Sequence, residues 1–445
     1  MKKRMLKSVF AVAAAISGNL SLAWGQLPDG WDGDRLLALV DGDMAATAYA
    51  DGKLHPIPTA KDVLFSIPQV VPSEETTRAQ NTASVPNTVM GWPGSMVVST
   101  DQRFAYIVSS RGSVAKSVSE FDDGVFSGMP VTETLSVIDL STMTLAAEQS
   151  VCRKPMSVDI APDSSWLLVT CGDATQELAI VPLVDGLPEP PRAIDLDLVS
   201  YSERDVDAGA TYGKVHPSGA SAAIVLSNRA VGLVRFEQDA EGVPLDGVAE
   251  APIETKRWLS VGRWTKSGNH FLVADTGWGP AATDAVMNKN SDIVSFALSP
   301  DDIRRGVVST ARVSKSPEAM EFNRDKDLLA VVNMERTYLP GGFPTGLFRH
   351  RKASSLSLVK VDDETGELAT LGKPMTFRGV LPEDAVFDAD GDHIAVVVYQ
   401  DHGRPRSDGW VTFFRIDGTG DNRRPVETGV RVPLPRGGHD LAAID

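Results

Sequence analysis

Acidic and basic residues recur near the beginnings of seven similar short segments of this 445-residue chain. Among them, Glu318, Glu383 and His439 have side chains that could serve as a general base. Arg263 could pair with a substrate carboxylate or with a developing oxyanion. Clustered carboxylates raise the pKa of at least one member, whereas a nearby Arg or Lys lowers the pKa of others. A base, a cation and water suffice to hydrolyse an activated ester or lactone, so these four residues form the candidate catalytic set.

Further polar residues are expected around the same place, some in the same segments and some at the ends of the strands that follow them. The candidate ligand-binding residues are Tyr212, Lys214, Asp275, Glu335, Asp384 and Asp440. A purely structural interpretation competes with the catalytic one, because polar side chains at the centre of such a fold are commonly satisfied by one another and by water.

Other chemistries lack their sequence signatures. The seven histidines are scattered, and the HExxH, CxxCH, GxSxG, GxGxxG and P-loop patterns are missing from the sequence. We therefore predict no metal and no cofactor. Asp388, Asp390 and Asp392 could suggest calcium, but they lack the spacing and the closing Glu of an EF-hand, so we interpret them as a turn.

The segments that carry the candidate residues repeat every 50 to 65 residues, approximately, and each is followed by another run rich in β-formers. The copies are Pro93 to Asp101, Pro155 to Asp163, Ala210 to Ser218, Leu259 to Ser267, Pro317 to Asp325, Pro382 to Asp390 and Gly437 to Asp445. Such a period, without helical patterns, predicts an all-β fold: a seven-bladed β-propeller of four-stranded antiparallel blades.

The last copy stands on the final residues, without partner strands after it. The strands near the beginning of the chain lack such an innermost segment, so we expect the C-terminal strand to pair with the N-terminal strands and close the ring. In four-stranded blades, the connections between the second and third strands emerge on one face. Long connections of this kind are predicted at residues 113–131, 276–290, 336–352 and 401–407, and loops gathered on one face favour binding there.

The first 25 residues have the pattern of a secretory signal: four basic residues, an apolar stretch and a small-residue cleavage site. The alternative is a retained N-terminal anchor. We expect a periplasmic or secreted protein with one domain over residues 26–445, monomeric and without a membrane span after cleavage. The net charge of −16 makes nucleic acid an unsuitable partner.

The chain has two cysteines, Cys152 and Cys171, which lie across one predicted hairpin. An oxidising compartment would allow a disulfide, worth about 3 kcal/mol in the chain-entropy description. A catalytic or metal-binding pair is the less favoured alternative, because no third ligand lies nearby in the sequence.

Several strings resemble the lactonase-type seven-bladed propellers typified by bacterial 6-phosphogluconolactonase and, more loosely, the secreted YVTN-repeat propellers. They are "LPEDAVFDADGDHIAVVVYQ", "SPEAMEFNRDKDLLAVVNME", "NHFLVADTGW" and "DDETGEL". The resemblance implies that Asp275 occupies the family's DxG position and that Glu335 lies near its NE position. The chain departs from the family where Glu318 and Glu383 follow proline in place of arginine, and where Tyr212 ends a segment that replaces Pro-His-Ser. These losses disfavour a phosphorylated substrate.

The sequence thus supports two main functional hypotheses. The first is an exported hydrolase of a small lactone or sugar-derived ester, with its site in the polar funnel that the beginnings of the innermost strands are expected to form at the axis. The second is a non-catalytic propeller that binds a protein, a glycan or a small ligand through the face that carries the long connections, which we call the insertion face. A third possibility is a redox subunit that docks a partner carrying the cofactor. The expected partners are a small-molecule or glycan ligand and a periplasmic protein.

Overall fold

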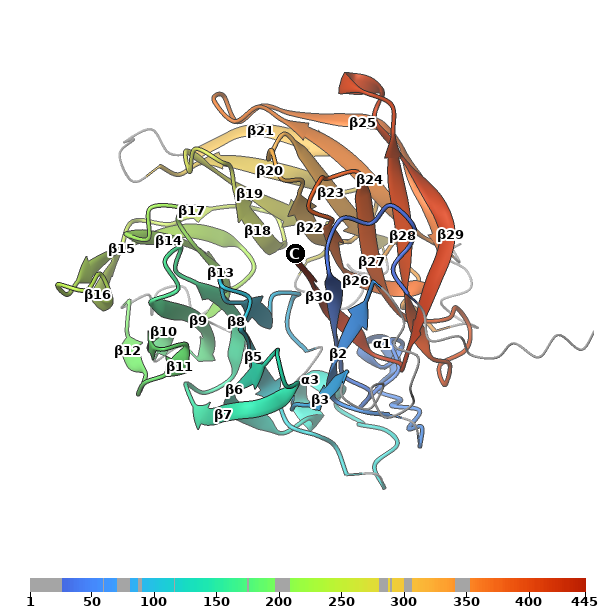
Figure 1. The fold of residues 1–445 in the computed structure, drawn as a ribbon, viewed down its shortest axis with the longest axis horizontal. Coiled ribbons are helices and arrows are strands. Elements are labelled where there is room, and N and C mark those ends of the chain that lie inside the picture. The colour runs from blue at the N-terminus through green and yellow to red at the C-terminus, as the bar shows by residue number, and fades with distance from the viewer. Residues whose placement is uncertain are drawn as a thin grey trace, which may run out of the picture.

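The computed structural model describes residues 26–69, 81–115, 117–173, 176–196, 209–279, 287–299, 306–340 and 353–445, apart from residues 59, 87–89 and 289. The predicted leader, residues 1–25, lies outside the described residues. Seven antiparallel sheets are arranged in a ring (Figure 1). The predicted seven-bladed all-β propeller is therefore confirmed.

Blades one to four follow the chain from the innermost strand outward. Blade one is β4 (Met96–Val98), β5 (Phe104–Arg111), β6 (Val131–Asp139) and β7 (Thr144–Ser150). Blade two is β8 (Pro155–Ile160), β9 (Trp166–Asp173) and β10 (Gln176–Val184), with β11 (Leu187–Pro188) and β12 (Arg192–Ile194) both paired to β10. Blade three is β13 (Ala210–Val215), β14 (Ser221–Leu226) and β15 (Ala230–Gln238), with β16 (Pro244–Ala249) and β17 (Ile253–Glu254) both paired to β15. Blade four is β18 (Leu259–Trp264), β19 (His270–Asp275), β20 (Asp292–Ala297) and β21 (Gly306–Arg312).

The remaining blades complete the ring. Blade five is β22 (Pro317–Phe322), β23 (Leu328–Asn333), β24 (Ala353–Val361) and β25 (Leu368–Arg378). Blade six is β26 (Val380–Phe387), β27 (His393–Gln400), β28 (Gly409–Asp417) and β29 (Arg424–Leu434). Blade seven is β30 (Gly438–Ile444), β1 (Arg35–Val40), β2 (Val63–Pro68) and β3 (Thr82–Ser84). The short helices are α1 (Ala48–Asp51) and α3 (Val125–Gly128), and η2 (Gly420–Asn422) is a 3-10 turn.

The two ends of the chain share blade seven, as predicted. Strand β30 pairs antiparallel with β1, from Arg35 opposite Ile444 to Val40 opposite Gly438. Each innermost strand contacts the innermost strand of the next blade, all the way round from β4 to β30 and back to β4. Closure leaves no innermost strand without a neighbour, which removes an edge that could otherwise pair with another chain.

The second strands of the blades are apolar on both faces because neighbouring blades cover both sides. Strands β14, β23 and β27 are buried at every position. Their sequences are rich in Val, Ile, Leu and Ala, which suit a pleated surface packed on both faces.

Long connections follow the second strands of five blades and therefore lie on one face. They span residues 41–62, 112–130, 276–291, 334–352 and 401–408, of which 59, 116, 280–286, 289 and 341–352 lie outside the described residues. Sequence reasoning missed the first of them. Parts of the connections 41–62, 112–130 and 334–352 pack with residues of β26, of β27 and of the segment before β4 in a separate apolar cluster, which we call the cap. Its buried members are Met44, Ala46, Ala48, Leu54, Met90, Val125, Met129, Met334, Tyr338, Leu339, Val380, Leu381 and Tyr399.

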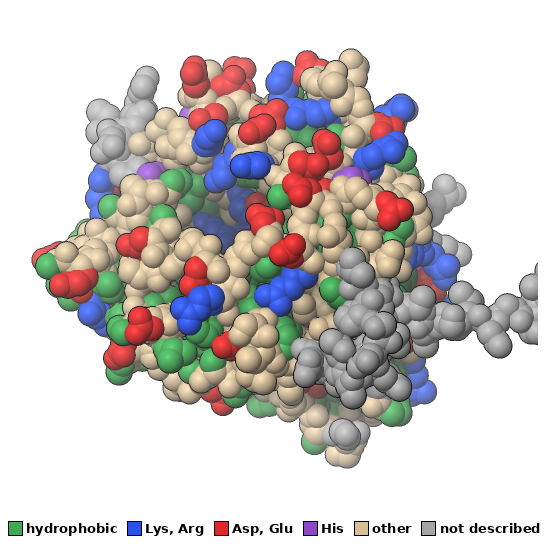
Figure 2. Space-filling model, viewed as in Figure 1, with side chains coloured by type: hydrophobic (Ala, Val, Ile, Leu, Met, Phe, Trp, Pro, Cys, Tyr) green, Lys and Arg blue, Asp and Glu red, His purple; other side chains and the backbone are tan. Residues whose placement is uncertain are grey.

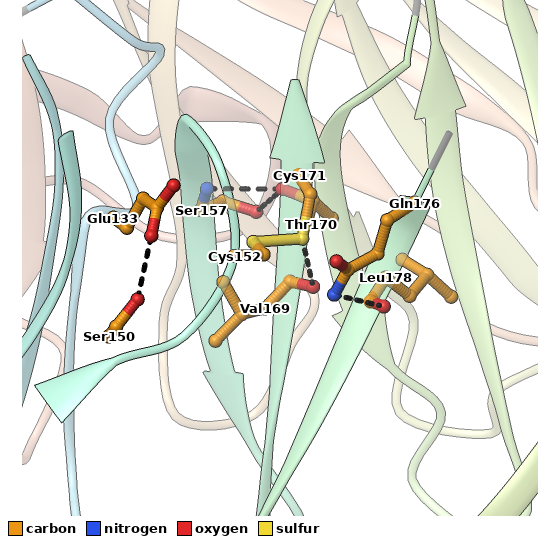
Figure 3. Close-up of a disulfide and its surroundings, with 9 residues drawn as sticks. All are labelled: Glu133, Ser150, Cys152, Ser157, Val169, Thr170, Cys171, Gln176 and Leu178. Atoms are coloured by element: carbon orange, nitrogen blue, oxygen red, sulfur yellow. Dashed lines mark hydrogen bonds between the residues drawn. A yellow bond between two sulfur atoms is a disulfide. The ribbon is translucent and has the colours of Figure 1, made fainter. Parts of the chain in front are cut away.

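The predicted disulfide is present. Cys152 precedes β8 and Cys171 lies in β9, with 6.1 Å between their Cα atoms (Figure 3). Beside it, the hydroxyl of Thr170 accepts a hydrogen bond from the Ser157 amide at 3.1 Å. The bridge thus reinforces the innermost hairpin of blade two.

The helices α1 and α3 are single turns of four residues each. Within the described ranges, no helix has the length and the apolar character of a membrane span.

Candidate functional site

Three candidate catalytic residues are brought together by neighbouring innermost strands. Glu318 belongs to β22, Glu383 to β26 and His439 to β30, and these strands follow one another round the axis. The strand register shifts between Pro317 and Ala319, and again between Pro382 and Ala385. An extra residue in a strand re-aims the local side chains, so both glutamates sit at irregular positions beside the axis.

Glu318, Glu383 and His439 form what we call the acid–histidine cluster. Glu383 Oε2 lies 3.8 Å from His439 Nδ1. The two carboxyl groups share a hydrogen bond. The exposed fractions are 4% for Glu318, 1% for Glu383 and 0% for His439. The cluster is therefore closed off from bulk water.

Burial raises the pKa of both carboxyl groups well above the usual range for glutamate. For Glu318 the next cause is the Glu383 carboxylate, and for Glu383 it is the Asp440 carboxylate. A buried carboxyl beside other carboxyls favours its neutral form. The pair therefore holds a proton more strongly than an ordinary glutamate does and can act as an acid.

Three polar atoms of the acid–histidine cluster find no hydrogen-bond partner within the described part of the chain. They are Glu318 Oε2, His439 Nδ1 and His439 Nε2. Buried polar atoms in proteins are nearly always hydrogen-bonded to protein or to water. The arrangement therefore suits a water molecule or a small polar ligand that would meet these atoms.

Asp384 and Asp440, predicted as ligand-binding residues, bind backbone amides. Asp440 accepts from the amides of Gly94 at 2.7 Å and Ser95 at 2.9 Å, and also from the Ser95 hydroxyl. Asp384 accepts from the Leu441 amide at 2.9 Å. These bonds join β26 to β30 and β30 to the segment before β4. Burial and the nearby Asp440 raise the pKa of Asp384 to about 7.

Arg263 lies with a second group of residues. Its Nε donates to Glu321 Oε2 at 2.9 Å, and its Nη1 donates to the Tyr212 hydroxyl. Lys214 Nζ pairs with Asp159 Oδ1 at 2.7 Å. Arg263 interacts electrostatically with Asp384, which in turn neighbours Glu383. The two groups therefore occupy successive levels along the axis.

The position within the repeat separates these two levels. Asp159, Lys214, Arg263 and Glu321 all stand at the fifth position of their segments, whereas Glu318 and Glu383 stand at the second. A comparison of these positions along the chain is a sequence signal that could distinguish the two groups.

Asp275 and Glu335 sit at the ends of second strands and make local contacts. Asp275 pairs with Arg257 at 2.7 Å and accepts from the Gly277 amide at 3.0 Å. Glu335 accepts from the hydroxyl of Ser355 at 2.8 Å. These contacts organise the turns after β19 and β23.

Two groups have side-chain spacing that could hold a metal. In the first, Asp388 accepts from the His393 amide and contacts its Nδ1, both at 2.9 Å, while Asp390 accepts from the Asp392 amide at 3.0 Å. These bonds have the character of a turn. The second group is Asp41, Asp43 and Asp62 in the connection 41–62.

Carboxylates of the second group also bond within the protein. Asp62 accepts from the Ser113 hydroxyl at 3.1 Å, and Asp41 accepts from the Asp43 amide at 2.9 Å. Burial and the neighbouring Asp62 raise the pKa of Asp43 to about 6.

Sequence reasoning missed two buried residues, Tyr49 and Arg436, because the position or the contacts of both depend on the connection 41–62. Tyr49 of α1 interacts electrostatically with Glu383 and Glu318, and burial raises the pKa of its phenol. Arg436 is fully buried and donates to the carbonyls of His55, Pro405 and Gly42, each at 2.7 Å. Arg436 thereby ties two connections of the insertion face to the start of β30.

Comparisons with known proteins agree with this fold. No family model matches the chain, and no curated protein matches it by sequence. Among solved structures, a candidate 6-phosphogluconolactonase of Bacteroides fragilis is 13% identical, with a TM-score of 0.58, covering 94% of this chain and 100% of that one. A similar candidate from Bacteroides uniformis is 14% identical, with a TM-score of 0.56, covering 92% and 100%.

The periplasmic gluconolactonase of Pseudomonas aeruginosa is 14% identical, with a TM-score of 0.57, covering 93% of this chain and 99% of that one. At such identities the likeness concerns the fold. The resemblance to lactonase-type propellers is thus confirmed at the level of architecture: the chain has the seven-bladed propeller fold of these structures over nearly its whole length.

Proposed function

We propose that this protein is an exported lactonase-like hydrolase that acts on a small lactone or sugar-derived ester at the acid–histidine cluster. One observation carries the proposal. A proton-holding carboxyl pair lies beside a histidine, and three buried polar atoms of the set find no partner within the described residues. Such atoms suit a reacting water and a substrate oxygen.

The cluster contains a base and an acid for ester hydrolysis. The imidazole of His439 would take a proton from water as the water oxygen bonds to the carbonyl carbon. The Glu318–Glu383 pair would donate its proton to the ring oxygen as the carbon–oxygen bond breaks. The product is a hydroxy acid, and positioned acids and bases of this kind contribute about a hundred- to ten-thousand-fold in rate.

Several features support the reaction class and the location. Three structural neighbours are named as gluconolactonases or candidate 6-phosphogluconolactonases, and one of them as periplasmic. The N-terminal secretory pattern and the disulfide favour an oxidising compartment. The glutamates that follow Pro317 and Pro382 favour a neutral lactone over a phosphorylated one.

The alternative function is ligand or protein binding without catalysis, through the insertion face. The observation that favours it is burial: the acid–histidine cluster is at most 4% exposed, and the connections of that face pack together in the cap. Under this alternative, the cluster serves only the packing of blades five to seven.

A lactone panel tests the proposal. The full chain without its leader is assayed for acid release from neutral lactones such as glucono-1,5-lactone. Glu318→Gln and His439→Ala should each lower kcat about a hundredfold or more. The matched controls Glu364→Gln and His55→Ala should leave it unchanged. Far-UV circular dichroism confirms that every variant is folded.

The outcomes separate the two functions. Turnover that the cluster variants abolish and the controls retain supports hydrolysis at this site. A folded wild-type protein that hydrolyses no lactone contradicts the proposal, and so does turnover that neither cluster substitution changes. In those cases, capture of a periplasmic partner that is lost on deletion of residues 112–130 would support the alternative.

A further inference from the structure

Three cations gather at the end of the axis opposite the cap. Lys214 in β13 and Arg263 in β18 stand late in their innermost strands, and Lys326 lies in the turn between β22 and β23. We call these three residues the basic cluster. The connections of the cap follow the second strands and so lie on the face where the innermost strands begin, whereas the basic cluster belongs to the other face. Figure 2 shows that face hollowed near its centre, with Lys and Arg side chains inside the hollow.

The basic cluster retains hydrogen-bond donors that the described residues do not use. Arg263 Nε donates a hydrogen bond to Glu321, and its Nη1 donates to the Tyr212 hydroxyl and to the Gly262 carbonyl. Arg263 Nη2 makes no hydrogen bond within the described ranges. Lys214 Nζ donates one hydrogen bond, to Asp159. The side chains of Arg263 and Lys214 are 17% and 19% exposed, so these donors can meet a ligand.

Lys326 is the least satisfied cation of the three. Its Nζ lies 3.4 Å from the Trp264 carbonyl and 5.9 Å from the centre of the Phe322 ring. Within the part of the chain that the structure describes, no carboxylate forms an ion pair with it. Burial lowers the pKa of Lys326, and the positive charges of Arg263 and Lys214 lower it further, although Glu321 and Asp363 oppose this.

The nearby carboxylates are already engaged. Asp159 bonds both Lys214 and the Val215 amide at 2.8 Å. Glu321 bonds Arg263 and the Phe322 amide at 2.9 Å. Two further carboxylates interact electrostatically with the basic cluster, Asp384 with Arg263 and Asp363 with Lys326.

Of these two, Asp363 accepts from the Ser267 amide at 2.8 Å. Asp384 has a pKa of about 7 and is therefore partly protonated at neutral pH. Lys214 and Arg263 thus each have a paired carboxylate, whereas Lys326 has none within the described residues, so a bound anion would meet the donors that remain.

We propose that this hollow binds one small oxyanion, a carboxylate or a phosphate, through Arg263 Nη2, Lys214 Nζ and Lys326 Nζ. Guanidinium and ammonium groups together recognise oxyanions by charge-assisted hydrogen bonds. Tyr212 and Glu321 hold the Arg263 guanidinium in place. The site occupies the next level along the axis from the acid–histidine cluster and shares no residue with it, so anion binding is measured independently of the proposed hydrolysis.

Binding of two probe anions tests the proposal. Inorganic phosphate and gluconate are each titrated calorimetrically into the full chain without its leader at low ionic strength, because salt screens exposed charges. Lys326→Met keeps the ion pairs of Lys214 and Arg263 intact. It should weaken binding about tenfold or more, the order expected for one charge-assisted hydrogen bond.

Lys360→Met is the matched control. Lys360 of β24 pairs with Asp421 in blade six, away from the axis, so its loss should leave the affinity unchanged. Binding of phosphate alone, of gluconate alone or of both supports the site and identifies its ligand class. Binding of neither anion overturns the proposal, as does binding that Lys326→Met and Lys360→Met change equally. Anion binding without lactone turnover would leave this site standing while the hydrolase proposal fails.

Discussion

Single residues of the acid–histidine cluster couple folding to pH. The folded protein raises the pKa of Glu318 and Glu383 by burial and by the repulsion of neighbouring carboxylates. A carboxyl with a raised pKa in the folded state contributes its full stability at a pH below its unfolded pKa. That contribution is lost as the pH rises towards the folded value.

We therefore expect Glu318→Gln to stabilise the protein increasingly as the pH rises above about 4.3, the ordinary value for glutamate. Gln has the shape of Glu but cannot ionise, so the variant avoids the cost of a buried charge. That cost grows by about 1.4 kcal/mol for each unit by which the pKa is raised. Urea unfolding of the variant and the wild type at several pH values measures the difference.

Glu364→Gln provides the comparison, because Glu364 is exposed in a turn. The difference in the free energy of unfolding between Glu364→Gln and the wild type should not change with pH. A difference for Glu318→Gln that is equally flat would show that Glu318 ionises in the folded protein as it does in the unfolded chain.

At the scale of elements, the innermost strands are organised by irregular strand beginnings and by carboxylate hydrogen bonds to the backbone of neighbouring strands. Register shifts mark the starts of β8, β13, β18, β22 and β26. Asp384 and Asp440 then tie neighbouring innermost strands through backbone amides. Carboxylate bonds to backbone N–H groups are among the stronger hydrogen bonds in proteins, so these two residues hold blades six, seven and one in register.

The start of β30 depends on a glycine. Gly437 has a φ of +106°, and a Cβ there would lie 1.4 Å from the Asp41 carbonyl oxygen. Gly437→Ala must therefore displace the connection 41–62 or the start of β30. We expect a loss in the free energy of unfolding of about 3 kcal/mol or more, beyond the usual range for point substitutions.

Gly242→Ala separates the steric effect from the backbone effect. Gly242 also has a positive φ, +81°, but a Cβ added there would meet nothing within 4 Å. We expect Gly242→Ala to lower the free energy of unfolding by about 1 kcal/mol, because only the unfavourable backbone conformation of alanine at a positive φ contributes. Equal losses for the two variants in chemical unfolding would contradict the close approach at the seam.

At the scale of the whole molecule, closure makes the ring one cooperative unit. Every innermost strand packs against two neighbours, and β30 completes the set from the far end of the chain. The apolar cluster at the seam joins Leu36, Ala38 and Val40 of β1 to Leu441 of β30 and to residues of blade six. Removing one strand would expose this apolar surface to water.

Deletion of residues 438–445 should therefore abolish the single cooperative unfolding transition and promote association through the exposed edge of β1. Urea unfolding followed by tryptophan fluorescence, together with size-exclusion chromatography, measures both effects. Deletion of Asp445 alone is the control, since this residue lies beyond β30. A truncated protein that still unfolds in one transition of unchanged midpoint would refute closure as the source of cooperativity.

The sequence by itself determined the blades, the shared seventh blade and the disulfide. Alternating apolar residues, turn residues and a repeated segment are local signals, and the ends of the strands follow from them. The pairing of Cys152 with Cys171 follows because one hairpin brings both residues to the same end. The repeat also supplied the three members of the acid–histidine cluster, since their strands had to meet at the axis.

Only the tertiary structure decided which axial side chains face one another and what covers them. Arg263 pairs with Glu321 and Tyr212 because the innermost strands of blades three, four and five bring these side chains to one level. Tyr49 lies in the connection 41–62 and interacts with Glu383 and Glu318, and Arg436 bonds the Gly42 carbonyl of the same connection, whose path depends on packing against distant loops. The contacts of Tyr49 with Glu383 and of Arg436 with Gly42 join segments hundreds of residues apart and leave no periodic trace in the chain, so no local pattern could reveal them.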